Sequence, residues 1–184
     1  MPSVASSGIK IDIAVEGRSW DKPAAAKAVV TRALREAAAV SSRRSAEISI
    51  VLTDDAAVRV LNRQWRGVDK ATNVLSFPTE GFPGEPPLLG DIVLAYETIA
   101  REASAEGKPF AHHLAHLAVH GFLHLLGYDH QRSRDAEAME RLERRILRRL
   151  AIPDPYRIGV KTPKRGLRKA RQKSPAGRPS VSPR

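Results

Sequence analysis

All six histidines of this 184-residue chain fall between residues 112 and 130. Four of them recur every four residues, so a helix would carry them on one stripe: His112, His116, His120 and His124. His120 and His124 would then offer two imidazoles from adjacent turns to one point, as in helical zinc sites. Gly127 would end the helix in a left-handed conformation and let the chain return His130 towards that point. Three such ligands with one open position are typical of a catalytic zinc ion, one per chain.

The histidine cluster also has plainer interpretations, namely a polar surface stripe, satisfied core histidines or a loose metal-binding tract. The pair followed by a glycine and a returning third histidine favours the metal site. A metalloprotease of the His-Glu-x-x-His type would need a glutamate where this chain has Gly121, so a peptidase lacks its general base. Three neutral imidazoles leave the ion its double positive charge, which favours an anionic substrate such as a phosphodiester.

The elements that must position these histidines can be predicted from periodicity and from turn signals. Apolar and polar residues alternate at strand period over 9–15 and 48–52, and short apolar strands are expected at 73–77 and 88–95. Pro23 suits the start of a helix to about Val40, and Asp54 the cap of a short second helix. Further helices are expected at about 96–106, 109–126 and 134–150. The pattern predicts a single-domain α+β fold, a small mixed sheet packed by helices, with a zincin-like metal-bearing helix.

Composition restricts the class of protein further. Cysteine is absent, which excludes disulfide scaffolds and thiolate metal sites. Of the net charge of +11, nine positive charges lie in 161–184, which has no acidic residue. We therefore expect a flexible N-terminus (1–8), one folded domain (9–158) and a disordered basic tail (159–184). The tail is either a salt-sensitive contact for RNA or a solubilising extension. With no apolar run long enough to span a bilayer and no signal peptide, we expect a cytoplasmic protein that binds no membrane.

Three segments resemble one known family. The run from His116 to His130 (HLAVHGFLHLLGYDH) looks like the signature of the YbeY family of bacterial zinc-dependent endoribonucleases. The segments 61–78 (LNRQWRGVDKATNVLSFP) and 89–92 (LGDI) resemble two further blocks of that family. The resemblance runs from about Ile9 to Leu150 and leaves out the basic tail. Trp65 stands where the family usually has Tyr or Phe.

The resemblance implies roles for particular residues. The zinc ligands would be His120, His124 and His130, and Arg66 would be the catalytic arginine that stabilises charge on the phosphodiester. A second set would support the metal ligands or contact RNA, namely His116, Asp129, Asn73 and Ser76. Each of these residues also has an ordinary structural interpretation, such as a turn, a strand edge or, for Arg66, an ion pair with Asp69 or a place on a solvated face.

The family's members act in 16S rRNA 3′-end maturation and late ribosome quality control, and they prefer single-stranded RNA. The resemblance therefore implies the 16S rRNA precursor and the ribosome as partners, with ribosomal proteins or assembly GTPases as further candidates. The competing hypothesis is a non-enzymatic ribosome-assembly factor, in which a structural zinc site holds a surface that docks on RNA or a ribosomal protein. A hydrolase for another substrate, such as a peptide, ranks behind both because of Gly121.

Overall fold

The computed structural model describes residues 8–42, 45–79, 88–128 and 133–156. The basic tail from 159 onward and nearly all of the predicted N-terminal segment lie outside these residues, as do Asp129 and His130. In chain order the elements are β1 (Gly8–Val15), α1 (Pro23–Val40), β2 (Ser45–Thr53), α2 (Asp55–Arg66), β3 (Val74–Pro78), β4 (Leu88–Ala95), α3 (Tyr96–Ala105), α4 (Phe110–Leu125) and α5 (Ser133–Arg149). The predicted elements are confirmed, and their ends differ by at most three residues.

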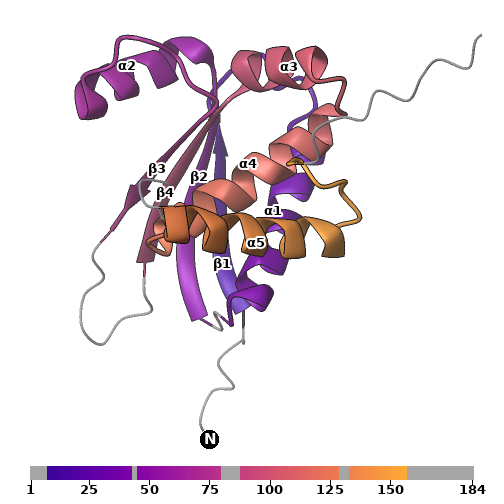
Figure 1. The fold of residues 1–184 in the computed structure, drawn as a ribbon. Coiled ribbons are helices and arrows are strands. Elements are labelled where there is room, and N and C mark those ends of the chain that lie inside the picture. Colours follow the sequence, from indigo (N-terminus) through magenta and orange to yellow (C-terminus); the bar gives the residue numbers. More distant parts are fainter. Residues whose placement is uncertain (1–7, 43–44, 80–87, 129–132, 157–184) are drawn as a thin grey trace, which may run out of the picture.

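The four strands form one mixed sheet in the order β1-β2-β4-β3. β2 pairs in parallel with β1 and β4, whereas β3 runs antiparallel to β4 at the edge. Figure 1 shows α1, α4 and α5 gathered beside the sheet and α2 apart from them at its upper end. This is the predicted α+β architecture with a single mixed sheet.

The second half of β4 is buried on both faces because it separates two apolar clusters. On β4, Ile92 and Leu94 belong to the larger cluster, which includes residues of α1, α4 and α5. The alternate residues Val93 and Ala95 join Val58 of α2 in a smaller cluster. Two residues apart means the same face of a strand, so α2 and the helix α4 lie on opposite faces of the sheet.

α4 is the central helix of the larger cluster, and it approaches the sheet closely at Gly121. A Cβ atom at Gly121 would lie 3.0 Å from Ile92 Cγ2 and 3.0 Å from Ser76 Oγ. Those contacts are tighter than ordinary van der Waals packing, so a larger residue would push α4 away from β3 and β4. The glycine that replaces the peptidase glutamate is therefore also a packing requirement of this fold.

The N-termini of α2 and α3 are capped by each other's side chains. The Glu97 carboxylate accepts hydrogen bonds from the Asp55 backbone N–H (2.8 Å) and from the Ser19 hydroxyl (2.6 Å). In return, Asp55 Oδ1 accepts from the Thr98 backbone N–H (3.0 Å) and the Thr98 hydroxyl (2.7 Å). Each carboxylate thus satisfies an N–H group that its partner helix leaves open, at the end where the helix dipole favours negative charge.

This reciprocal capping predicts a pH-dependent contribution to stability. Burial alone would raise the pKa of Glu97, but hydrogen bonds from Ser19 and the Asp55 N–H outweigh it and hold the pKa below its ordinary value. A lowered pKa in the folded state means that the ionised group stabilises the fold above about pH 4.3 and that this stabilisation is lost as the pH falls further. We expect Glu97→Gln to cost about 1 kcal/mol of unfolding free energy at pH 7 and progressively less in acid. Urea unfolding of both proteins across that range tests this, and a pH-independent difference would contradict it.

Candidate metal centre and its surroundings

α4 brings His120 and His124 together as the sequence predicted. Their Nε2 atoms lie 3.1 Å apart. Two nitrogens that bind the same tetrahedral zinc ion at 2.0–2.1 Å should lie about 3.3 Å apart, so the observed spacing fits a shared ion. Both rings are partly exposed and follow one another on one face of the helix. The geometry of the pair is therefore compatible with two ligands of one metal ion.

A buried glutamate of α5 orients the His120 ring. Glu143 Oε1 lies 2.6 Å from His120 Nδ1, and the glutamate side chain is completely buried. A carboxylate bound at Nδ1 keeps the proton there and leaves Nε2 unprotonated, as a ligand atom must be, which is the arrangement of carboxylate–histidine–zinc triads. Figure 1 shows α5 crossing over α4, and this crossing brings Glu143 to His120.

Two further side chains complete the surroundings of Glu143. The Tyr156 hydroxyl donates a hydrogen bond to Glu143 Oε2, because the segment after α5 turns back towards α4. His116 Nε2 lies 3.6 Å from the same oxygen, too far for a hydrogen bond but close enough for electrostatic attraction. The Tyr156 ring packs edge-on against the His116 ring with centroids 6.0 Å apart, and Arg144 lies over its face.

These contacts decide the charge on Glu143. Burial by itself would raise its pKa, but the interactions with His116, His120 and Tyr156 outweigh burial and hold the pKa well below the ordinary range. Burial and the same carboxylate raise the pKa of Tyr156, so its hydroxyl keeps the proton that it donates. Glu143 is therefore a buried anion behind the histidine pair, and its negative charge favours a cation at the imidazoles.

Glu143 also belongs to a second arrangement that could hold a cation. One ligand atom each from His116, His120 and Glu143 lie within 4.8 Å of one another. In that arrangement the carboxylate would bind the ion directly, whereas beside the His120–His124 pair it acts through an imidazole. The short contact of Glu143 to His120 Nδ1 and the 3.1 Å spacing of the two Nε2 atoms favour the role in which Glu143 acts through the His120 imidazole.

Either role predicts a strong effect of neutralising this carboxylate. We expect Glu143→Gln to weaken metal binding about 10- to 100-fold, because the anion behind His120 is lost while the size of the side chain is kept. Glu140→Gln, one turn earlier on α5 at a pair with Arg144, is the matched control and should bind metal like the wild type. Isothermal titration with Zn²⁺ gives both affinities. Equal affinities in the two variants would contradict the assignment.

Arg66 ends α2 and is exposed. Gly67, with φ +69°, ends the helix in the left-handed conformation immediately after it. The buried Asn62 donates to the Lys70 carbonyl (2.7 Å) and fixes the loop that follows. The ion pair with Asp69 is made by Arg59 (2.7 Å), and Arg66 has no ion pair among the described residues. The plain interpretation of Arg66 as the partner of Asp69 is therefore wrong.

The structure engages Asn73 and Ser76 in internal hydrogen bonds. Asn73 Nδ2 donates to Glu102 Oε2 (2.9 Å), and the same oxygen lies 2.8 Å from the Nε2 atom of the buried His113. Ser76 Oγ donates to the Gly121 carbonyl (3.2 Å), which ties β3 to the helix turn that carries His120. Both side chains hold the metal-bearing helix against its neighbours.

Sequence reasoning did not single out Glu143 or Tyr156. Glu143 does leave a signal, because it is a charged residue on the apolar stripe of α5, between Met139 and Ile146, and both of these are fully buried. A lone carboxylate at such a position needs a buried polar partner, and the histidines of α4 were the candidates for it. Tyr156 leaves no comparable signal, since its contact depends on the path of the chain after α5.

Comparisons with known proteins agree with the histidine motif. The family model described as Endoribonuclease YbeY matches residues 13–151. "Endoribonuclease YbeY" of Rhodopseudomonas palustris (strain BisB18) is 53% identical over 152 residues, covering 79% of this chain and 90% of the relative. That of Methylocella silvestris is 53% identical over 161 residues, covering 85% and 91%.

A solved structure shares the fold. The solution structure of TM1509 from Thermotoga maritima superposes with a TM-score of 0.52 at 21% identity, covering 77% of this chain and 91% of that one. At this identity the likeness concerns the fold alone. The family model spans the strands, the histidine helix and α5, and the relatives match over most of their own length. This chain belongs to the endoribonuclease YbeY family.

Proposed function

We propose that this protein is a single-strand-specific, zinc-dependent endoribonuclease that acts in 16S rRNA 3′-end maturation and late-stage ribosome quality control. The zinc ligands are His120, His124 and His130, the last of which lies outside the described residues. The observation that carries the proposal is the 3.1 Å spacing of two imidazole Nε2 atoms in a chain of this family. The family description, endoribonuclease, supports RNA as the substrate.

The metal ion, when bound, polarises a phosphoryl oxygen and lowers the pKa of a water molecule. The residues of the chain do the rest. Glu143 keeps His120 in the tautomer whose Nε2 carries no proton. Arg66, whose guanidinium is accessible and outside any ion pair among the described residues, grips two non-bridging oxygens and stabilises the charge that develops on them. His116 and Asp129 support the ligands, and Asn73 and Ser76 hold α4 in place.

The proposal also covers the remaining parts of the chain. The domain expected over 9–158 carries the chemistry, and the basic tail of 159–184, which lies outside the described residues, adds electrostatic affinity for RNA. The protein works in the cytoplasm on the ribosome, beside ribosomal proteins or assembly GTPases. Within the described residues, every helix is too short or too polar to cross a membrane.

A non-enzymatic ribosome-assembly factor is the second candidate. The observation in its favour is that the His120–Glu143–Tyr156 network joins α4, α5 and the segment after α5, as a structural metal site would. Purified wild type cutting single-stranded RNA with the 16S rRNA 3′-end sequence, at one zinc per chain, supports the enzyme. Equal cutting by wild type and by an Arg66→Ala preparation would show contamination and favour the assembly factor.

Tryptophan fluorescence reports whether RNA passes beside Arg66. Of the two tryptophans, Trp65 is 65% exposed next to Arg66, whereas Trp20 is 5% exposed and donates its indole N–H to the Thr53 carbonyl. We expect single-stranded RNA to quench Trp65 emission. Bases that contact an indole, or that displace water from it, change its fluorescence, and only the Trp65 indole is accessible to them. A titration compares wild type with Trp65→Phe, in which the quenching should vanish. Quenching that survives in Trp65→Phe would place the RNA elsewhere.

A further inference from the structure

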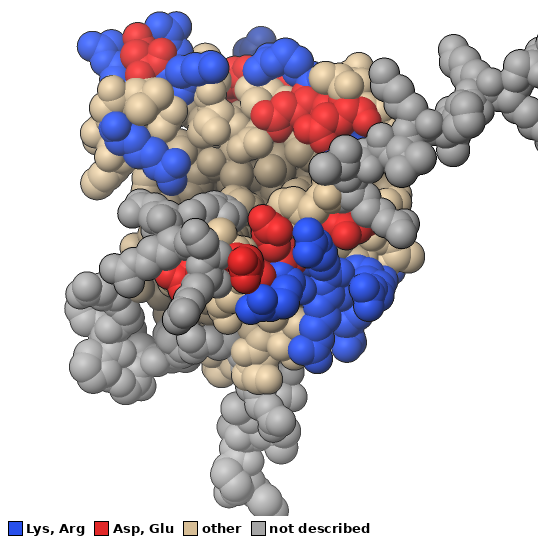
Figure 2. Space-filling model, viewed as in Figure 1, with Lys and Arg blue, Asp and Glu red and all other residues tan. Residues whose placement is uncertain are grey.

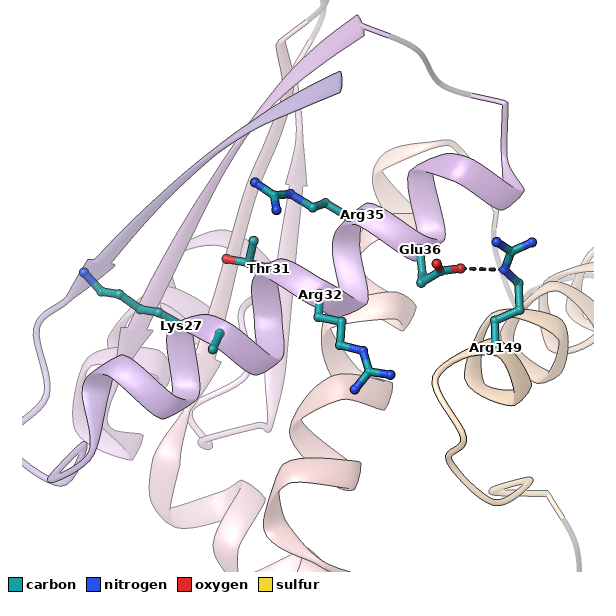
Figure 3. Close-up of a pocket in the computed structure, with 7 residues that line it drawn as sticks. Lys27, Thr31, Arg32, Arg35, Glu36 and Arg149 are labelled. Atoms are coloured by element: carbon teal, nitrogen blue, oxygen red, sulfur yellow. Dashed lines mark hydrogen bonds and ion pairs between the residues drawn. The ribbon is translucent and has the colours of Figure 1, made fainter. Parts of the chain in front are cut away.

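A shallow cavity of about 580 Å³ lies along the outer face of α1, at its contact with the end of α5. Figure 3 shows its cationic side chains in two rows: Lys27 and Arg35 extend to one side of α1, and Arg32 lies on the other side with Arg149 of α5. Small side chains, Ala28 and Thr31, occupy α1 near these cations. Such a surface has charge on both flanks and room between them.

Most of this charge is not neutralised within the fold. Lys27, Arg32 and Arg35 are exposed and make no ion pair among the described residues. Glu36 is the single acidic residue lining the cavity, and it pairs with Arg149. Four cations against one anion leave a net charge of +3 on one side of the molecule, which attracts anions and raises their local concentration.

The Glu36 pair also prepares Arg149 for an anion. Glu36 Oε2 accepts from Arg149 Nε at 2.6 Å, so the carboxylate uses one edge of the guanidinium. The other edge, formed by the two Nη groups, makes no hydrogen bond to the described residues, and Figure 3 shows both groups beyond the Nε atom that contacts Glu36. An arginine whose Nε is held by a carboxylate can bind phosphate through its two Nη groups, which lie in one plane.

The basic surface continues from the cavity onto α5. Figure 2 shows Lys and Arg side chains gathered over the second half of α5, while acidic side chains lie over the first half. Arg145 and Arg148 are exposed there and make no ion pair among the described residues. Glu143, on the buried face of the same helix, is six residues before Arg149, which is about 9 Å along the helix axis. α5 therefore joins the basic cavity to the candidate metal centre.

We propose that the α1–α5 cavity is a second binding site, one that takes the phosphate backbone of the single-stranded RNA on which the metal centre acts. This inference rests on the proposed function for the identity of the strand. The lining carries four cations and one anion, which favours an anionic ligand, and the chain's own tail carries nine positive charges and no acidic residue, so it is not a complementary occupant. Contacts to phosphate position a strand without reading its sequence, so the site contributes affinity and register rather than specificity.

The test removes two charges from the cavity in the full-length chain. Arg32→Ala/Arg35→Ala is compared with Lys10→Ala/Arg101→Ala, which lowers the net charge equally at exposed pairs with Glu47 and Asp55. The probe is fluorescein-labelled single-stranded DNA, which offers the same phosphates and is not a ribonuclease substrate. Losing two phosphate contacts should weaken binding about tenfold at 0.15 M salt and reduce the slope of log K against log[salt] by about 1.4. The control should keep both affinity and slope nearly unchanged.

Two further arms keep the outcome decisive. Arg32→Lys/Arg35→Lys should retain most of the affinity, because the salt-dependent contribution depends on the number of cations at the phosphates and lysine keeps that number. In RNA cleavage, the alanine double variant should raise KM with kcat unchanged, since the cavity holds the strand away from the reacting bond. Equal weakening by the control pair, or an unchanged salt slope, overturns the cavity as a site. DNA binding decides this even if the wild type cuts no RNA, so failure of the cavity and failure of the proposed nuclease are separable.

Discussion

Arg66→Ala is expected to lower kcat for RNA cleavage about 10²- to 10³-fold while the bound metal and the melting temperature stay as in the wild type. That magnitude is typical for loss of one donor aimed at charge that develops in the transition state. Stability should hold because the Arg66 side chain is exposed and makes no ion pair among the described residues. Cleavage of single-stranded RNA, metal analysis and thermal unfolding on the same preparation give the three readouts.

Arg59→Ala is the matched control for this experiment. Arg59 is an exposed arginine on the same helix, held by Asp69 through two hydrogen bonds of 2.7 and 2.9 Å. Its loss removes the same charge from α2 but leaves the end of the helix intact, so near-normal cleavage is expected. If the two variants lose activity equally, the effect is one of net charge on α2, and Arg66 has no special role. Loss of metal from Arg66→Ala would instead show a structural effect on the site.

His124→Ala is expected to purify without stoichiometric metal and without nuclease activity, yet to remain folded. Two ligands in place of three hold a divalent ion far more weakly, and the pair of Nε2 atoms that defines the site is gone. The fold should survive because the His124 ring is partly exposed, while the core residues of α4, such as Phe122 and Leu123, are fully buried and unchanged. Metal content, circular dichroism and cleavage are measured together.

His116→Ala separates the two arrangements of ligands. If the ion sits on His120 and His124, this variant keeps its metal, since His116 lies behind Glu143. If the ion sits among His116, His120 and Glu143, this variant loses it and His124→Ala retains it. An unfolded His124→Ala protein with intact RNA binding in the folded variants would support the assembly-factor hypothesis over the enzyme.

Local signals explain why the elements could be predicted. Asp54 caps α2 by accepting from the Ala57 N–H at 2.9 Å, and Gly127 takes a φ of +90° just after the histidine helix, as expected. Capping and left-handed turns depend on residues adjacent in sequence, and so do the periods of strand and helix. The order of the strands could not be predicted in this way. β4 lies between β2 and β3, and this placement depends on contacts between residues far apart in the sequence.

The candidate metal site likewise combines features that depend on neighbouring residues with features that depend on tertiary contacts. His120 and His124 are one helical turn apart, so their convergence is a local property that spacing predicts. Glu143 reaches them only through the packing of α5 on α4, and Tyr156 only through the return of the chain after α5. The pairing of Arg59 instead of Arg66 with Asp69 likewise depends on how the loop after Gly67 is folded. Tertiary contacts therefore determine which residues surround the histidine pair, and these residues could not be predicted from the sequence alone.

The mutual capping of α2 and α3 has a dynamic consequence. Because Glu97 satisfies the Asp55 N–H and Asp55 satisfies the Thr98 N–H, neither helix can open its first turn without exposing a polar group of the other. Opening is then cooperative, and the amides at the two N-termini should exchange with solvent deuterium at one common rate rather than as two independently fraying ends. The first turn of the helix that ends at Arg66 is therefore expected to open together with the first turn of a helix 42 residues further along the chain.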